Sequence, residues 1–153
     1  MKYLLAYDGS SNSKQALDLT IKLLKPTDDQ LVVLTVTERI PQADWPFFGD
    51  VWPKEEEAKQ LTQKRKDAND AILEEVRAPL NEHNISYTLM NKVSLDVRSE
   101  IMDKVEEIQP DILVLGARGL GTVRGLLMGS VSQYCARNSK VPVLVVPPHK
   151  DEV

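Results

Sequence analysis

The sequence predicts an α/β fold with a mostly parallel sheet at its centre. Short apolar runs alternate along the chain with segments in which apolar residues recur at helical spacing, and this alternation is typical of repeated βα units. Most of the apolar runs are continuous in Leu, Val and Ile, as expected of strands that helices cover on both faces. We therefore expect five strands alternating with four helices in a single domain over residues 1–153, with no linker or repeat.

The five expected strands are short. They cover residues 2–7, 31–37, 85–91, 111–115 and 142–147. The run at 85–91 differs from the others because polar and apolar residues alternate in it. Such alternation is typical of a strand with one exposed face, so we expect this strand at an edge of the sheet.

The four expected helices each carry an apolar stripe. They cover residues 11–25, 54–77, 94–108 and 130–139. The first follows a cluster of Ser and Asn at 10–13 that suits an N-cap, and Pro26 ends it. The second is rich in charged residues, which we interpret as a solvated face.

Composition argues against several classes of protein. With 153 residues, 42% of them hydrophobic, the chain can bury a core without a disulfide or a structural metal. A net charge of -4 does not suit a nucleic-acid binder, which needs a basic surface. No run approaches the ~20 apolar residues of a membrane span, and the first residues turn polar too early for a signal peptide. We therefore expect a cytoplasmic protein with neither nucleic acid nor membrane as partner, and with its single cysteine, Cys135, in the core.

Residues 38–53 form a connection that is too long for a simple turn. They contain three prolines, both tryptophans and both phenylalanines of the chain. Loops of this length in compact domains are commonly functional, and clustered aromatic residues are unusual in disordered segments. Two interpretations stay open: the rings pack the loop onto its own domain, or Trp45, Phe47, Phe48 and Trp52 form a lid or partner surface.

A glycine-rich stretch follows the fourth expected strand. Five of the seven glycines lie between residues 116 and 129, and a helix is expected to begin directly after them. Glycine allows close backbone approach, and the first N–H groups of a helix are unpaired and lie at the positive end of its dipole. Together these features predict an anion site, where the hydroxyls of Ser130 and Ser132 either add donors or cap the helix.

Two common phosphate motifs do not fit this stretch. A Walker A loop needs Gly-Lys, which occurs nowhere in the chain, so the sequence excludes a P-loop NTPase. The dinucleotide motif Gly-x-Gly-x-x-Gly belongs after the first strand, where this chain has only Asp8-Gly9-Ser10. A Rossmann dehydrogenase is therefore not expected.

The spacing of the glycines resembles a known signature. Gly116-x-x-Gly119, nine further residues and then Gly129-Ser130 are similar to the nucleotide-binding pattern G-2x-G-9x-G-(S/T) of the ATP-binding universal stress proteins. The resemblance extends over essentially the whole chain. It includes an Asp at the end of the first strand (Asp8), the Leu-Thr-Val run at 34–36 and the Pro-Val-Leu-Val-Val run at 142–146.

The resemblance implies a doubly wound five-stranded parallel sheet of order 3-2-1-4-5, with helices on both faces. In open α/β sheets, ligands bind outside the carboxyl ends of the strands where the strand order reverses, which here means between strands 1 and 4. The resemblance assigns adenine to Asp8 and the backbone of Val36, and the base and ribose to Leu115 and Gly116. It assigns the phosphates to Gly119, Gly129, Ser130, Val131 and Ser132, and the expected site also includes Ala6, Tyr7 and Arg118.

At Gly129, two reasons for glycine stay open. A side chain there would either intrude on the phosphates or oppose a backbone angle that only glycine adopts.

We expect ATP to bind with Mg²⁺ that the phosphates and water hold, because no carboxylate cluster is apparent near the loop. The last strand, 142–147, is an apolar edge, and together with the resemblance it implies a homodimer.

Two alternatives to plain ATP binding stay open. One is a slow ATPase or phosphoryl-transfer enzyme, for which Arg118 and Arg124 are the available charge clamps and no catalytic base is found. The other is a homodimeric interaction module that does not need nucleotide. His83 and His149 are isolated in the sequence, so no metal or catalytic residue is expected.

Overall fold

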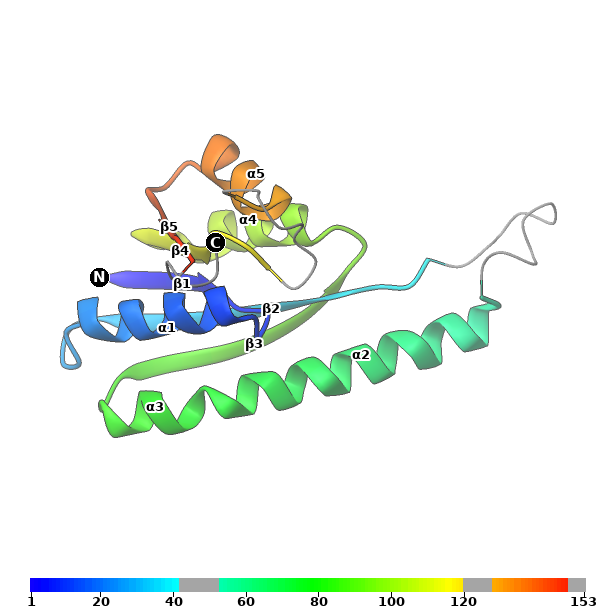
Figure 1. The fold of residues 1–153 in the computed structure, drawn as a ribbon, viewed down its shortest axis with the longest axis horizontal. Coiled ribbons are helices and arrows are strands. Elements are labelled where there is room, and N and C mark those ends of the chain that lie inside the picture. Colours follow the sequence, from blue (N-terminus) through cyan, green and yellow to red (C-terminus); the bar gives the residue numbers. More distant parts are fainter. Residues whose placement is uncertain (42–52, 120–127, 149–153) are drawn as a thin grey trace.

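The computed structural model describes residues 1–41, 53–119 and 128–148. These residues form a five-stranded, all-parallel sheet of order β3-β2-β1-β4-β5 (Figure 1). The strands are β1 (Lys2–Ala6), β2 (Gln30–Glu38), β3 (Ser86–Ser94), β4 (Ile112–Gly116) and β5 (Val143–Val146). The strand order confirms the expected fold class, and β3 lies at an edge as its alternating pattern predicts.

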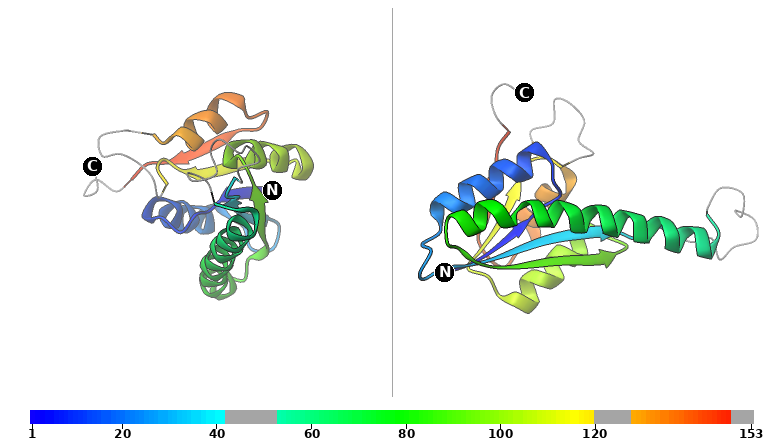
Figure 2. Two further views of the ribbon diagram at one scale, coloured as in Figure 1. Left: turned by 90° about the vertical axis from the view of Figure 1, so that its right-hand side faces the viewer. Right: turned by 90° about the horizontal axis from the view of Figure 1, so that it is seen from below.

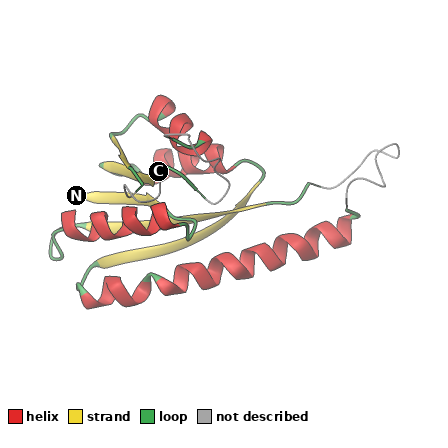
Figure 3. Cartoon of the chain, viewed as in Figure 1, coloured by secondary structure: helices red, strands yellow, loops and turns green. Residues whose placement is uncertain are grey.

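Helices cover both faces of this sheet (Figure 3), five of them among the described residues. They are α1 (Ser11–Leu23), α2 (Glu55–Glu75), α3 (Arg77–Glu82), α4 (Val97–Ile108) and α5 (Ser130–Asn138). The first three pack on one face and the last two on the other, and Figure 2 shows the two layers from the side. None of these described helices is long and apolar enough to span a membrane.

The central strands are apolar throughout because both of their faces are covered. Along β1, Leu4 points into the core beneath α4 and α5, whereas Tyr3 and Leu5 point into the core beneath α1, α2 and α3. Leu4 and Leu5 are both fully buried. Neither face of such a strand is exposed to solvent, so polar residues do not alternate with apolar ones. This explains the continuous apolar runs in the sequence.

The helix expected at 94–108 begins three residues later than its pattern suggests. Ser94 is the last residue of β3 and lies opposite Glu38 of β2, so it belongs to the sheet. Asp96 caps α4 instead, since its Oδ1 accepts a hydrogen bond of 2.9 Å from the N–H of Arg98. The sheet pairing therefore takes residues that the apolar stripe assigned to the helix.

The helix expected at 54–77 is divided at Val76. α2 ends at Glu75, and the short α3 carries the chain to Glu82. Pro79 in α3 has no N–H and cannot donate to the carbonyl of Glu75, which is where a continuous helix would need its next hydrogen bond.

The strand order creates a position suited to a ligand. β1 leads into α1 on one face, and β4 leads towards α5 on the other face, although β1 and β4 are neighbours in the sheet. At the carboxyl ends of these strands Ala6 lies between Leu34 and Leu115. The sheet therefore opens at the point where the strand order reverses, as expected of doubly wound folds.

Candidate functional site

A cavity of about 620 Å³ lies at this switch point, over the carboxyl ends of β1, β2 and β4. Its volume falls within the range of small-molecule sites, about 300–1,000 Å³. Every site residue expected from the sequence lines it: Ala6, Tyr7, Asp8, Val36, Leu115, Gly116, Arg118, Gly119, Gly129, Ser130, Val131 and Ser132. Residues far apart in the sequence thus meet around one hollow.

The cavity also has walls that the sequence did not indicate. They comprise Ser13, Leu34, Thr35, Glu38, Arg65, Ala68, Asn69, Val97 and Ile101. Leu34 and Thr35 directly precede Val36 on β2, so their place in the cavity follows from that of Val36. The α4 residues Val97 and Ile101 read as ordinary core positions, and the α2 residues carry no motif at all.

The first turn of α5 presents backbone donors to the cavity. The first hydrogen bond within the helix runs from the N–H of Gln133 to the carbonyl of Gly129 at 3.0 Å. The N–H groups of Ser130, Val131 and Ser132 precede it and find no acceptor among the described residues. Three donors at the positive end of a helix are an arrangement suited to an anion.

Neither serine caps this helix, contrary to one of the two expectations. Gly129 occupies the N-cap position without a side-chain hydrogen bond. Its φ of -75° and ψ of 163° are extended angles that any residue adopts, so the expectation of a glycine-only backbone angle is wrong. The remaining reason for glycine at this position is that a side chain would occupy the space in front of the helix.

Ser132 has a structural contact within the site. Its side chain is buried, and its hydroxyl donates to the carbonyl of Gly116 at 2.7 Å. Two backbone hydrogen bonds act beside it: Gly129 N–H donates to Ala117 O at 2.6 Å, and Ala117 N–H donates to Val146 O at 2.7 Å. These bonds fix the start of α5 against the ends of β4 and β5.

The glycines of β4 and its following turn allow close approach from two directions. A Cβ added to Gly116 would lie 2.7 Å from the backbone carbon of Asn12, so α1 packs directly on this glycine. A Cβ added to Gly119 would lie 2.7 Å from Oδ2 of Asp8. Only glycine fits at either position without a shift of its neighbour.

Asp8 organises the turn between β1 and α1. Its Oδ1 accepts hydrogen bonds from the N–H of Ser10 at 3.0 Å and from the hydroxyl of Ser10 at 2.5 Å. The oxygen of Ser10 in turn accepts from the N–H of Ser13 at 3.2 Å and so caps α1. Gly9 between them has a φ of +78°, which favours glycine. The carboxylate is therefore held at the cavity edge beside Gly119.

The middle of the cavity is apolar, and its far end is polar. Val36, Val97, Ile101 and Leu115 supply aliphatic surface. Glu38, Arg65 and Asn69 lie at the β2 side, where Arg65 Nη1 donates to the carbonyl of Glu38 at 3.4 Å.

The cavity wall includes the phenol of Tyr7, whose titration is changed by burial. Burial raises the pKa of Tyr7 to about 12, with the acidic side chains Glu75, Asp8 and Asp18 adding to the effect. Its phenol is therefore neutral at physiological pH. Among the described residues, no three His, Cys, Asp or Glu side chains lie close enough to hold a metal ion.

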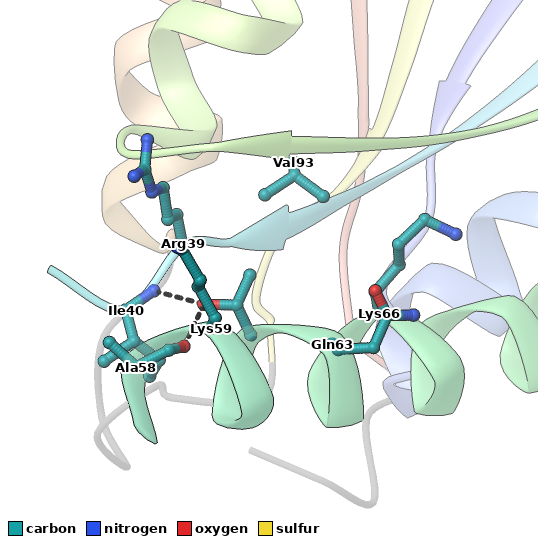
Figure 4. Close-up of a pocket in the computed structure, with 8 residues that line it drawn as sticks. Arg39, Ile40, Ala58, Lys59, Gln63, Lys66 and Val93 are labelled. Atoms are coloured by element: carbon teal, nitrogen blue, oxygen red, sulfur yellow. Dashed lines mark hydrogen bonds between the residues drawn. The ribbon is translucent and has the colours of Figure 1, made fainter. Parts of the chain in front are cut away.

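A second hollow, of about 480 Å³, lies between α2 and the ends of β2 and β3 (Figure 4). Two of its cations are already paired, Lys59 with Glu55 at 2.6 Å and Lys66 with Asp70 at 2.7 Å. The Thr62 hydroxyl accepts from Ile40 N–H and donates to the Ala58 carbonyl. Its polar groups are thus largely engaged, and it lies away from the strand-order switch. The aromatic segment 45–52, Arg124 and His149 lie outside the described residues.

Fold and cavity together define a doubly wound α/β protein with a ligand-sized hollow at its switch point. The model of the universal stress protein family matches residues 1–147. This chain belongs to the universal stress protein family. Among curated relatives, universal stress protein YxiE of Bacillus subtilis is 27% identical over 145 residues, which cover 95% of this chain and 97% of the relative.

Solved structures share the fold at low sequence identity. Hypothetical protein MJ0577 superposes with a TM-score of 0.82 at 21% identity, covering 97% of this chain and 96% of its own. A universal stress protein family protein from Arabidopsis thaliana with AMP bound has a TM-score of 0.71 at 21% identity and covers 99% of this chain and 94% of its own. A universal stress protein in complex with cAMP has a TM-score of 0.64 at 23% identity, and 95% of each chain is covered.

Proposed function

We propose that this protein is a regulatory, stress-response protein that binds ATP in the switch-point cavity. One observation carries the proposal: three backbone donors at the start of α5 and the Asp8–Gly119 contact border the same hollow. An elongated ligand with an anionic end and a flat, partly apolar end matches these surroundings. The AMP and cAMP in two structures of the same fold support an adenine nucleotide in particular.

The phosphates would lie at the start of α5. The N–H groups of Ser130, Val131 and Ser132 would donate to phosphate oxygens, and the exposed hydroxyl of Ser130 would add a donor. Ser132 would have to exchange its hydrogen bond with Gly116 O for one with phosphate, so we assign it mainly a positioning part. Arg118 at the cavity wall supplies positive charge.

The base and ribose would occupy the apolar middle. Leu115 and Val36 flank this space, and the backbone of Val36 and the carboxylate of Asp8 would supply polar contacts. Gly116 also borders this space through its backbone. Mg²⁺ would accompany ATP through phosphate oxygens and water, as is usual for this ion, since the described residues offer it no ligand cluster.

We also propose that two copies of the chain associate through β5. This strand pairs with β4 and with no other described strand, and its Val143, Leu144 and Val145 are half-buried. An apolar strand at an open edge is normally covered or paired, and a two-fold β5–β5 contact covers both edges at once.

Mass spectrometry of the purified protein tests the ligand directly. We expect denaturation to release ATP or another adenine nucleotide in amounts close to one per chain. In titrations of the ligand-free protein, Asp8→Ala should reduce the preference for ATP over GTP, because its proposed contact is with the nucleoside. A protein that carries no nucleotide and binds neither one would favour a nucleotide-independent interaction module.

A further inference from the structure

A chain of hydrogen bonds runs from β3 through β2 to the wall of the cavity. It begins at Asn91 of β3, whose Nδ2 donates to the carbonyl of Lys66 at 3.1 Å and to Oδ1 of Asp70 at 2.8 Å. A carbonyl and a carboxylate are acceptors only, so the amide nitrogen must face them. The orientation of the Asn91 amide is therefore determined, and its Oδ1 faces Thr37.

Thr37 transmits this orientation to α2. It is fully buried, and its hydroxyl donates its single hydrogen to Oδ1 of Asn91 at 2.7 Å. The oxygen of Thr37 can then only accept, and it accepts from Nδ2 of Asn69 at 2.9 Å. The nitrogen of Asn69 thus faces Thr37. Its Oδ1 has no donor among the described residues, and Asn69 lines the cavity.

Asn69 lies at the opposite end of the cavity from the phosphate donors. Asn69 is hydrogen-bonded to Thr37 of β2, whereas the phosphate donors of α5 follow β4. In the sheet, β1 lies between β2 and β4. Two strand spacings are about 10 Å, roughly the reach from the phosphates to the base in an extended nucleotide. Val36, the proposed neighbour of the base, immediately precedes Thr37.

We propose that Asn69 is a specificity-determining residue that reads the 6-amino group of adenine. The assignment rests on the proposed function. An amide oriented in this way offers Oδ1 as an acceptor and its remaining N–H as a donor. The adenine edge presents the complementary pair, an amino donor next to a ring nitrogen acceptor, which is the pairing that asparagine makes with adenine elsewhere. Guanine has a carbonyl in place of the amine, which places an acceptor against Oδ1.

Two nucleotides that differ in this one group provide the test. ATP and purine riboside 5′-triphosphate, which lacks the 6-amino group, are titrated into the wild-type protein, Asn69→Ala and the control Asn81→Ala. We expect the wild type to prefer ATP by about tenfold. Asn69→Ala should abolish the preference by weakening ATP alone, and Asn81→Ala, the same change at an exposed site in α3, should retain it.

Thr37→Val tests the orientation of the Asn69 amide. It also provides a second test in case Asn69→Ala fails to fold. It keeps Asn69 but removes the hydroxyl that directs its amide, so the preference for ATP should fall here too. If Asn69→Ala weakens the binding of both nucleotides equally, or if it keeps the preference for ATP, the assignment of Asn69 to the amino group is wrong. The proposal that the protein binds a nucleotide would still stand. If the wild type binds neither nucleotide, the proposed function fails first and this assignment with it.

Discussion

Gly116 and Gly119 lie three residues apart but lack side chains for different reasons. The backbone of α1 occupies the space beside Gly116, whereas a flexible carboxylate, that of Asp8, occupies the space beside Gly119. A backbone cannot move without shifting its helix, and a side chain can rotate away. The first glycine is therefore tied to the fold and the second to the cavity.

Alanine at each position should separate these roles. Gly116→Ala forces α1 away from β4 and should lower the free energy of unfolding by about 1–3 kcal/mol, as overpacked cores do. Gly119→Ala should cost less stability and instead weaken nucleotide binding, because it displaces Asp8. Urea unfolding of the two variants decides the matter. Equal losses of stability would show that the two contacts are alike.

Cys135 should be inert in the folded protein. It lies on the core-facing side of α5 with its side chain fully buried, and burial raises the pKa of its thiol to about 11. Reaction with a thiol reagent at pH 8 should therefore be slow and should accelerate with urea as the protein unfolds. Rapid labelling without denaturant would mean that α5 opens readily.

At the scale of single residues, the sequence predicted positions better than contacts. The glycine spacing placed Gly129 and Ser130 at a helix start, and the helix begins there. It did not reveal that the Ser132 hydroxyl donates to Gly116, because that bond joins residues 16 apart that only the sheet brings together. Nor did it indicate Asn69, which depends on partners in β2 and β3.

At the scale of elements, α4 illustrates how pairing overrides a helical pattern. The apolar stripe favours a helix from Ser94, but β2 and β3 remain in register up to Glu38 and Ser94. The helix then begins at Val97 and is capped by Asp96, whose carboxylate accepts hydrogen bonds from the backbone and the guanidinium of Arg98. The Arg98 hydrogen bonds hold the pKa of Asp96 below its ordinary value.

Removing this cap should destabilise the protein in a pH-dependent way. Asp96→Ala should cost about 1 kcal/mol at neutral pH. Asp96→Asn keeps a capping oxygen and isolates the charge. Because folding lowers the pKa of Asp96 below its ordinary value of 3.8, its charge stabilises the protein fully above that value, and the contribution is lost as pH falls through the lower folded pKa.

Unfolding free energies of the wild type and Asp96→Asn from pH 7 to pH 3 provide the check. The difference between the two curves should narrow at the acid end. A difference that stays constant over this range would show that the charge of Asp96 does not contribute.

At the scale of the whole molecule, the alternation of apolar runs and helical stripes predicted the layers, and the family resemblance predicted the strand order. The site was predictable where it is built from strand ends and the helix start that follows β4. The wall supplied by α2 was not, because that helix reaches the cavity only through its packing on β2 and β3. Its Arg65, Ala68 and Asn69 carry no pattern that distinguishes them from a solvated helix face.

The proposed dimer depends on the outer edge of β5. Val145→Lys places a charge on the β5 edge and should convert a dimer into a monomer, as should Val143→Lys, although Val143 also packs on the core. Ser86→Lys at the opposite edge of the sheet should leave the dimer intact. Sedimentation at several concentrations measures the outcome. A wild-type protein that sediments as a monomer throughout would contradict the association through β5.

If the start of α5 holds the phosphates of ATP, a side chain in front of this helix should weaken binding, and a calorimetric titration of Gly129→Val beside the wild type measures the effect. The backbone angles of Gly129 are open to valine, so the variant should fold normally while its side chain fills the space in front of the helix. We predict saturable binding of ATP to the wild type and at least ~10-fold weaker binding to the variant, on the order of 1.4 kcal/mol. Equal affinity in two folded proteins, or no binding by the wild type, would contradict the account.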